Sequence, residues 1–544
     1  MICFISTARV HLRWIFLERE FKKLALVAIP HSDSGDDIVN PLGLHSIAAY
    51  LERNSNDLEV RIFDFSYSNI CYEAACTEVL EWSPDVVGIS IYSQYVEVAN
   101  RFGHILTTKA PDVLLIAGGA HITLMPKDFL SDTECRFDIA IAGDGEKPVL
   151  ELMNLVSKHN IAKHVLMDRN ISEIEGLSYR TGLGMIHTTD KICRLQGEEW
   201  ENPLVINATD KIDLVEFRGF DSKKIVKGAV VISSRSCPYR CSFCSITAID
   251  GKKNEWRAIP PDKLVDWLKD AREKLGFDHV SFLDANFFVR KKRVLEFSQL
   301  FHKAFNGSVT WSASSTVGYV INLKDDLGLL YRQGLRKVEI GIEAGSQKQL
   351  DYFIKHSRVE QNLAAIRLLR KNKIQLGLDF IMFYHDQTIE EIKENLLFIH
   401  SAGLTEYPSF DHLYNMLLLY PGTAIRSNLE RELNVQFAPN EIPVSRDFIK
   451  NSLVKDVYCN YIDYFIKPYL NKIEDYINDI SYKLSLNTTN RTQKAKLSLF
   501  ITALRHVPFK VLWVLVENEG RLDSLKDCLD EYEEIIAKYE ELYI

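Results

Sequence analysis

Three cysteines lie within eight residues of one another, in the stretch "SSRSCPYRCSFCSIT". Cys237, Cys241 and Cys244 have the spacing C-x3-C-x2-C. A structural zinc site usually combines two separated Cys or His pairs, and no second C-x2-C or H-x3-H pair follows downstream. A 4Fe-4S cluster takes one ligand per iron, so three cysteines on one loop would leave one iron open to a substrate. The spacing therefore favours an iron-sulfur cluster over a zinc site.

The composition of the chain excludes several classes of protein. At 544 residues, with 46% apolar and 26% charged residues, the chain is long enough for several globular domains. Its net charge of -9 and the absence of a long Lys/Arg run do not indicate nucleic-acid binding. Ten cysteines are too few for a disulfide scaffold, and no apolar run reaches the roughly 18 to 20 residues of a membrane span. We therefore expect a cytoplasmic protein without a membrane span or a nucleic-acid partner.

Short strand-like and helix-like segments alternate after an N-terminal extension of residues 1–23. This pattern predicts a parallel, doubly wound, flavodoxin-like α/β domain of five strands over residues 24–160. No G-x-G-x-x-G follows the first strand, which argues against a dinucleotide. Ligands of such sheets bind beyond the carboxyl ends of the strands, although glycines there can also serve only tight turns. The candidate ligand-binding residues at that edge are Ser90, Gly118, Gly119, Gly143 and Gly145.

A second alternating series begins near residue 228. Residues 161–227 look like a linker with a β-hairpin, and six βα-type units over residues 228–430 then predict a partial TIM-like barrel. The cysteine loop follows the first strand of this series, where βα loops form the active-site rim of a barrel. Residues 431–544 are dominated by helix patterns, and the apolar spacing in the last segment predicts packing in a helical bundle rather than a coiled-coil partner surface.

Polar side chains also follow the other strands of the second series. The carboxyl ends of parallel strands meet at one edge, so we expect these side chains to lie near the cysteine loop. They are Asp284 and Asn286 after the second strand, Ser312 and Ser314 on the third, Glu343 after the fourth, and His385 and Asp386 after the fifth.

The cysteine loop resembles that of the radical S-adenosylmethionine (SAM) enzymes. "CPYRCSFC" matches that family's C-x3-C-x-Φ-C loop, in which Phe243 is the aromatic residue, and "VEIGIEAGSQKQL" and "LYPGT" look like later segments of the family. The N-terminal domain, with "PDVVGIS", "IAGGAHITLMP" and "IAGDGE", resembles the cobalamin-binding domain of the cobalamin-dependent subgroup. Together the resemblances cover residues 24–430, in the order typical of that subgroup.

The resemblance implies cofactors and roles for the residues of the cysteine loop and the strand ends. The three cysteines would hold a 4Fe-4S cluster, and its open iron would chelate SAM. One electron, supplied by an external donor such as flavodoxin or ferredoxin, would cleave SAM to methionine and a 5'-deoxyadenosyl radical, which a dry barrel protects. Glu343 is suited to SAM's ribose hydroxyls or ammonium. The further expected SAM contacts are Phe243, Arg257, Asn286 and Ser314, of which Arg257 and Asn286 could equally be salt-bridge or capping residues.

The resemblance also implies cobalamin. The D-x-H-x-x-G loop of the cobalt-coordinating cobalamin domains is absent, because the first strand is followed by "IPHSDSGDD". His31 and His121 are alternative cobalt ligands, but a lone loop histidine is more often a hydrogen-bonding partner. We expect cobalamin without a protein histidine on cobalt. After the fifth strand, "FIMFYHDQTIEE" replaces a Gly-Pro-Gly-like turn that is common in the family.

These observations support three hypotheses of function. The first is a radical SAM methyltransferase that acts on an unactivated carbon of a peptide or secondary metabolite. The second keeps the radical chemistry without methyl transfer and gives cyclisation, rearrangement or epimerisation. The third is a non-catalytic iron-sulfur or cobalamin carrier. A methylthiotransferase is less favoured, because that relative has a second three-cysteine cluster, for which Cys71, Cys76 and Cys135 are poorly spaced.

Overall fold

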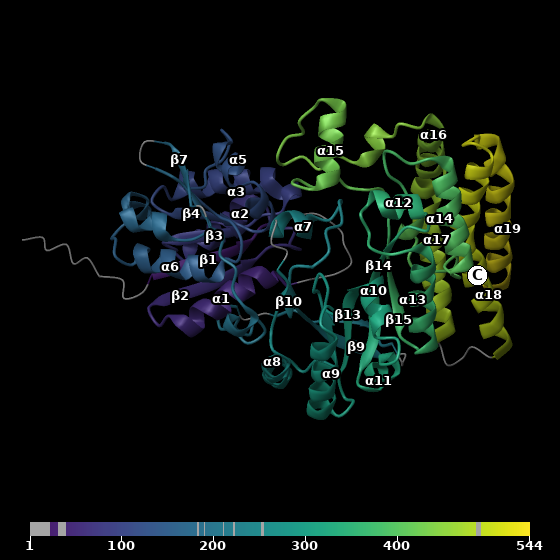
Figure 1. The fold of residues 1–544 in the computed structure, drawn as a ribbon, viewed down its shortest axis with the longest axis horizontal. Coiled ribbons are helices and arrows are strands. Elements are labelled where there is room, and N and C mark those ends of the chain that lie inside the picture. Colours follow the sequence, from purple (N-terminus) through teal and green to yellow (C-terminus); the bar gives the residue numbers. More distant parts are fainter. Residues whose placement is uncertain are drawn as a thin grey trace, which may run out of the picture.

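The computed structural model describes residues 22–30, 40–181, 184–189, 191–209, 212–220, 224–251, 255–485 and 491–543. An N-terminal α/β domain, a second sheet with its helices, and a group of C-terminal helices follow one another along the long axis of the molecule (Figure 1). The two sheets therefore follow one another along this axis, and the C-terminal helices lie on the side of the second sheet that faces away from the first domain (Figure 1).

The first sheet has the strand order β2-β1-β3-β4-β5-β6-β7 within the described residues. The first five strands in this order pair in parallel, which confirms the predicted doubly wound sheet. The predicted hairpin is β6 and β7, and it extends this sheet in antiparallel fashion. The strands are β1 (Lys22–Ala28), β2 (Leu58–Asp64), β3 (Val86–Ser90), β4 (Leu114–Gly118), β5 (Ile139–Ile141), β6 (Leu177–Arg180) and β7 (Ile186–Thr188).

Helices cover both faces of the first sheet because successive strand residues point to opposite sides. Leu24 and Leu26 pack in one apolar cluster with Val149, whereas Val27 packs in another with Phe102. The helices are α1 (Leu42–Asn54), α2 (Tyr72–Glu81), α3 (Val96–Lys109), α4 (Ala120–Leu124), α5 (Pro126–Ser131) and α6 (Glu146–Val156).

The second sheet has the order β15-β14-β13-β12-β9-β8 in the described part of the chain. Strands β9, β12, β13, β14 and β15 pair in parallel, and the edge strand β8 pairs antiparallel to β9. The curled, open sheet confirms the predicted partial barrel (Figure 1). The strands are β8 (Val215–Arg218), β9 (Ile225–Val231), β12 (His279–Phe282), β13 (Thr310–Thr316), β14 (Leu335–Glu343) and β15 (Gln375–Phe380).

The sixth predicted βα unit differs from expectation. Its strand, expected near residues 410–420, is reduced to isolated bridges that join Met416 to Phe383 and Leu418 to Val444. A short 3-10 helix at Asp411–Leu413 and a proline at position 421 bound the run, and the residues between them include no β-branched side chain. The run therefore continues the barrel rim without forming a full strand.

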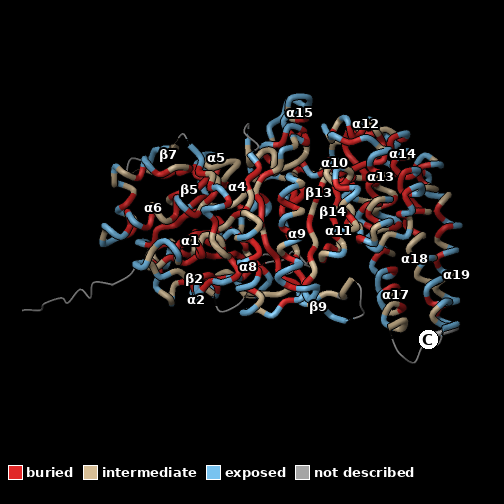
Figure 2. Tube along the Cα trace, turned by 60° about the horizontal axis from the view of Figure 1, so that its bottom comes forward, coloured by how far each residue is buried: buried red, intermediate tan, exposed pale blue. Residues whose placement is uncertain are grey.

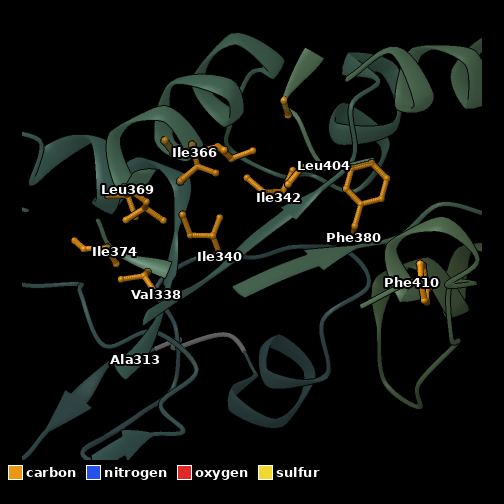
Figure 3. Close-up of a cluster of buried hydrophobic side chains, with 14 of the residues drawn as sticks. Ala313, Val338, Ile340, Ile342, Ile366, Leu369, Ile374, Phe380, Leu404 and Phe410 are labelled. Carbon is orange, nitrogen blue, oxygen red and sulfur yellow. The ribbon is translucent and has the colours of Figure 1, made fainter. Parts of the chain in front are cut away.

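Apolar side chains on one face of the second sheet pack against its helices. Figure 3 shows Val338, Ile340 and Ile342 of β14 against Ile366 and Leu369. The intervening side chains point to the opposite, concave face of the sheet, so polar residues can gather there. The helices are α8 (Pro261–Leu275), α9 (Lys291–Phe305), α10 (Val317–Asn322), α11 (Leu327–Arg332), α12 (Gln347–Tyr352), α13 (Val359–Lys371), α14 (Ile389–Ser401) and α15 (Ala424–Leu433).

The C-terminal helices pack together as the apolar spacing predicts. Leu525, Tyr532 and Tyr539 are buried, and Figure 2 shows the buried residues of these helices on the sides where they face one another. The helices are α16 (Ser452–Tyr461), a π-helical turn (Ile462–Ile466), α17 (Lys467–Ser485), α18 (Arg491–Glu517) and α19 (Lys526–Tyr543).

Helix α18 departs from the expected absence of a membrane-length apolar segment. Among the described helices it alone is long and apolar enough to span a membrane, by length and composition only. Arg505 and Lys510 interrupt its apolar run, which is why the run escapes a search for uninterrupted segments. In the fold, α18 packs against α14, α16, α17 and α19, and 44% of its apolar window is buried. These four helices therefore cover part of its apolar surface.

Candidate active site between the two sheets

The cysteine loop lies between β9 and the short helix α7 (Ser245–Asp250). Backbone hydrogen bonds fix it to two later elements: Ser242 N donates to Phe353 O at 2.9 Å, and Ile425 N donates to Ser242 O at 3.0 Å. The loop is thus held between the end of α12 and the start of α15. The structure therefore places Cys237, Cys241 and Cys244 at the C-terminal edge of the second sheet, where sequence reasoning expected them.

The three thiols fit a cluster better than a single ion. Burial raises the pKa of Cys241 to about 12 and also raises the pKa of Cys244. Among the described residues, no three Cys, His, Asp or Glu side chains converge on one ion position. A 4Fe-4S cluster does not need such convergence, because each cysteine binds a different iron. The donor set, three thiols on one loop, suits that cluster.

Asn286 lies beside the first of these cysteines, as the sequence predicts. Its side chain is fully buried, and its Nδ2 lies 3.9 Å from Cys237 Sγ. Its Oδ1 is buried without a hydrogen-bond partner, which costs free energy unless a ligand supplies a donor. A SAM molecule bound next to the cluster could supply one through its ammonium group. Asn286 therefore fits the predicted cofactor-binding role.

Glu343 ends β14 in a strained backbone conformation, with φ of 64°. Its Oε1 accepts a hydrogen bond from Lys355 Nζ at 2.7 Å, and both side chains are buried. Burial alone would lower the pKa of Lys355, but Glu343 and Cys241 raise it overall. Lys355 and Cys241 line the same small cavity. Sequence reasoning missed Lys355, because nothing in a single sequence shows that α12 returns the chain to Glu343.

Ser314 lies on the concave face of the second sheet, which is polar and only partly buried. The same face carries Asp379 of β15, which is in register with Gly341 and remains accessible. Loss of hydration and the carboxylates of Glu343 and Glu339 raise the pKa of Asp379 to about 7. Asp379 was not predicted, although its place at the end of the fifth strand was a usable signal.

His385, in the loop after β15, has hydrogen-bond partners at both ring nitrogens. Its Nε2 lies 3.0 Å from Tyr352 Oη, and its Nδ1 lies 3.0 Å from Ser445 Oγ. The neighbouring Asp386 pairs with Lys450 at 2.9 Å. The loop after β15 is therefore held by a hydrogen bond and an ion pair to the segment that contains Ser445 and Lys450.

The structure shows Arg257 in a salt bridge, one of the two roles that the sequence left open for it. Its guanidinium is buried, donates to Leu195 O at 2.6 Å, and pairs with Asp144 of the first domain. A second arginine, Arg235, pairs with the same carboxylate at 3.2 Å. Burial works against ionisation of Asp144, but Arg235 and Arg257 outweigh it and hold its pKa below the usual range. Arg257 therefore has the salt-bridge role that the sequence left open.

A cavity of about 240 Å³ opens at the C-terminal edge of the first sheet. The second sheet's side contributes Ile232, Arg235 and Trp267 to its wall. A neighbouring cavity of about 380 Å³ shares Ile232 and reaches Leu283. A Cβ atom at Gly118 would meet nothing within 4 Å, so this glycine leaves open space. The first cavity gathers all five predicted residues of this edge, Ser90, Gly118, Gly119, Gly143 and Gly145.

The two histidines considered as cobalt ligands have different outcomes. His121 is buried, its Nδ1 lies 3.0 Å from Ser93 Oγ, and burial lowers its pKa to about 4. It does not line either cavity, so it has the hydrogen-bonding role expected of a lone histidine. His31 lies outside the described residues.

Comparison with protein-family models identifies both domains. Residues 34–153 match the model of the B12 binding domain, and residues 231–399 match that of the radical SAM superfamily. The order of the two matches is the order in which the two cofactor candidates occur along the chain.

Several curated proteins are similar to this chain. A protein of Pyrococcus horikoshii named as an uncharacterized methyltransferase is 26% identical over 462 residues, which cover 82% of this chain and 93% of that protein. The anaerobic magnesium-protoporphyrin IX monomethyl ester cyclase of Rubrivivax gelatinosus is 25% identical over 65% of this chain and 60% of its own length. The hopanoid C-3 methylase of Methylococcus capsulatus is 22% identical over 63% of this chain and 61% of its own length.

A solved structure shares the fold of nearly the whole chain. It is the cobalamin-dependent S-adenosylmethionine radical enzyme OxsB with aqua-cobalamin and S-adenosylmethionine bound. The TM-score is 0.72, at 17% sequence identity, over 94% of this chain and 76% of that chain.

Proposed function

The chain belongs to the cobalamin-dependent radical SAM enzymes, and on this premise we propose that it methylates an unactivated carbon of its substrate. Its cofactors are a 4Fe-4S cluster, SAM and cobalamin. When bound, the cluster and SAM supply a 5'-deoxyadenosyl radical that takes a hydrogen atom from the substrate, and cobalamin supplies the methyl group. One SAM would be spent on the radical and another on remethylation of cobalamin.

The observation that carries this proposal is the position of Arg235. It lines the cavity that holds the predicted cobalamin-binding residues, and it stands two residues before Cys237. The two cofactor sites are therefore joined by one short piece of chain. A substrate between them could meet both the radical and the methyl donor. Similarity to proteins named as methyltransferases or methylases supports the same reaction.

The side chains of the site have separable tasks in this proposal. Cys237, Cys241 and Cys244 bind the cluster, whereas Asn286 and Glu343 offer hydrogen-bond acceptors to SAM. Asp144 and its two arginine partners close the junction between the domains, which limits the access of water to the radical. Ser314 and Asp379 present polar groups on the concave face, where a substrate could bind.

The substrate and the electron donor complete the proposal. We place the enzyme in the cytoplasm, with a peptide or a secondary metabolite as substrate and a flavodoxin or ferredoxin as reductant. A flavodoxin or ferredoxin can reach the cluster only from outside, and Pro238 and Arg240 of the cysteine loop are exposed.

A second candidate function keeps the radical chemistry without methyl transfer. Similarity to the cyclase of Rubrivivax gelatinosus favours it, since that protein is named for ring formation. Cyclisation, rearrangement or epimerisation would use the same cluster and SAM residues. The two candidates differ in the mass of the product, because methyl transfer adds one methylene unit for each turnover.

Anaerobic reconstitution tests both candidates. The purified chain is loaded with iron, sulfide and cobalamin and incubated with SAM, a reductant and candidate substrates. We expect 5'-deoxyadenosine, and a product heavier by one methylene unit. The Cys241→Ala variant is the control and should form no 5'-deoxyadenosine. Equal amounts from both proteins would exclude radical SAM chemistry at these cysteines, and an unchanged substrate mass with 5'-deoxyadenosine formed would favour the second candidate.

A further inference from the structure

Lys355 is a buried lysine that the proposed reaction does not yet use. Its Nζ lies 2.7 Å from Glu343 Oε1, and the side chains of Lys355 and Glu343 are 8% and 9% exposed. A lysine is rarely buried this far unless its charge has a partner, and removing a buried ion pair from water is costly. The burial of this ion pair is therefore not explained by a gain in the stability of the fold, which suggests a functional role for it.

Two features of the backbone accommodate this ion pair: a glycine at position 341 and a positive φ at Glu343. A Cβ atom at Gly341 would lie too close to both Glu343 Oε1 and Lys355 Nζ, so the pair in this arrangement uses the space that the glycine leaves open. Glu343 itself has a positive φ, a conformation that a non-glycine residue keeps only where the surroundings enforce it. Strain of this kind is concentrated at functional sites, which points to a role for the pair in the reaction.

The pair lies beside one cysteine of the loop. Cys241 and Lys355 line one small cavity together with Tyr239 and Thr316, and Cys241 is buried. After burial, the charges with the largest effect on the pKa of Cys241 are Lys355, which lowers it, and Glu343, which raises it. A charge at this position acts through protein rather than through water, so its effect on the sulfur is only weakly screened.

We propose that Lys355 is a positioning residue for the reductive step, which fixes the Glu343 carboxylate and raises the midpoint potential of the cluster through its positive charge beside Cys241. This inference rests on the proposed function, because it requires the cluster. Reduction adds one electron, and hence one negative charge, to the cluster. A nearby ammonium stabilises the reduced form more than the oxidised form, and net charge is one of the factors that set the potential of iron-sulfur clusters. The cluster then accepts the electron from its donor more readily.

Two substitutions of Lys355 distinguish the effect of its charge from the effect of its packing. The Lys355→Met variant keeps most of the unbranched side chain and removes the charge, whereas Lys355→Arg keeps the charge. The matched control is Lys348→Met, because Lys348 lies nearby on α12, pairs with Glu391 at 3.2 Å and is 68% exposed. Each variant is reconstituted anaerobically, its iron is counted, and its cluster is titrated without SAM while the electron paramagnetic resonance signal of the reduced form is recorded.

We expect the Lys355→Met cluster to be harder to reduce by about tenfold at a fixed potential, which is about 59 mV for a one-electron couple. The Lys355→Arg and Lys348→Met clusters should titrate like the wild type. A Lys355→Met protein with full iron and the wild-type potential would overturn the proposal. If Lys355→Met loses its iron, Glu343→Gln decides, because it leaves the Lys355 charge uncompensated and should shift the potential upward. An unchanged or lower potential in Glu343→Gln overturns the proposal.

The titration also separates this inference from the proposed function. A wild-type chain that binds a cluster but forms no 5'-deoxyadenosine contradicts the proposed function, while the potentials of the variants still decide the role of Lys355. A wild-type chain that binds no cluster overturns both.

Discussion

Asp144 and Arg257 form a buried ion pair that joins the two α/β domains. Asp144 belongs to the "GDGE" segment after β5, and Arg257 belongs to the short strand that pairs with Arg235. Arg235 in turn bonds to Glu146 and lies over the ring of Trp200, 4.3 Å from its centroid. Two carboxylates of the first domain thus meet two arginines that flank the cysteine loop. This contact lies between the glycine-lined cavity and the cysteine loop.

Replacing Arg257 should destabilise the protein strongly. In Arg257→Met the Asp144 carboxylate keeps Arg235 but loses its most buried partner, and removing one member of a buried pair costs about 3 to 5 kcal/mol. Urea denaturation, followed by circular dichroism, measures the loss. The control is Lys269→Met, which removes an exposed partner of Asp266 and should change the free energy of unfolding little, because water screens an exposed ion pair. Equal losses in the two variants would show that the ion pair of Asp144 and Arg257 does not stabilise the fold.

Loss of one loop cysteine should abolish cluster binding without unfolding the chain. We expect Cys241→Ser to retain little iron after anaerobic reconstitution, because a hydroxyl is a poor replacement for a thiolate on iron. Cys76→Ser is the matched control, since Cys76 is buried in the first domain and far from the loop in the fold. Iron and sulfide analysis with absorbance spectra gives the result. Full iron in Cys241→Ser, or loss of iron in Cys76→Ser, would contradict the assignment of the ligands.

Filling the glycine-lined cavity should displace cobalamin. A side chain at Gly118 points into open space, so Gly118→Leu should fold normally while occupying part of the cavity. Gly118→Ala adds one methyl group and is the control. Extraction and absorbance after anaerobic purification with cobalamin give the amount bound, which we expect to fall at least about tenfold, an effect of about 1.4 kcal/mol, in the leucine variant alone. Normal retention by Gly118→Leu would place cobalamin elsewhere.

Local patterns in the sequence predicted the fold and part of the site, whereas pairings between distant residues could not be predicted. The alternation of strand and helix patterns and the glycines at strand ends depend on neighbours along the chain, so the first sheet and its cavity were foreseen. The partners of Arg257 and Glu343 were not, because Asp144 is 113 residues from Arg257 and the return of α12 brings Lys355 to Glu343. The run near Met416 did not form the expected strand, although its apolar pattern resembles one, because a 3-10 helix and a proline bound it and it contains no β-branched residue.

Buried histidines should make the protein sensitive to mild acid. Burial lowers the pKa of His279 to about 3 and that of His385 to about 4, from an ordinary value of 6.5. A folded-state pKa below the unfolded value means that the unfolded chain binds more protons as the pH falls through 6.5. The free energy of unfolding is therefore not reduced by these histidines above about pH 6.5. Below that pH it declines steadily towards about pH 4, by roughly 1.4 kcal/mol per pH unit for each histidine.

The pH dependence of denaturation in His279→Gln tests this explanation. The His279 ring nitrogens lie 2.8 Å from Thr310 Oγ1 and 2.9 Å from Ser312 Oγ, contacts that a glutamine amide can partly replace. The variant should be less stable at pH 7. Between pH 6.5 and 4.5, however, its free energy of unfolding should fall less steeply with pH than that of the wild type, and the difference in slope should correspond to about one proton. His104→Gln is the control, since that side chain is exposed in the first domain. Parallel pH profiles for His279→Gln and the wild type would mean that His279 is not the group whose protonation destabilises the fold, because only the slope, and not the absolute stability, reports the proton that the folded protein excludes.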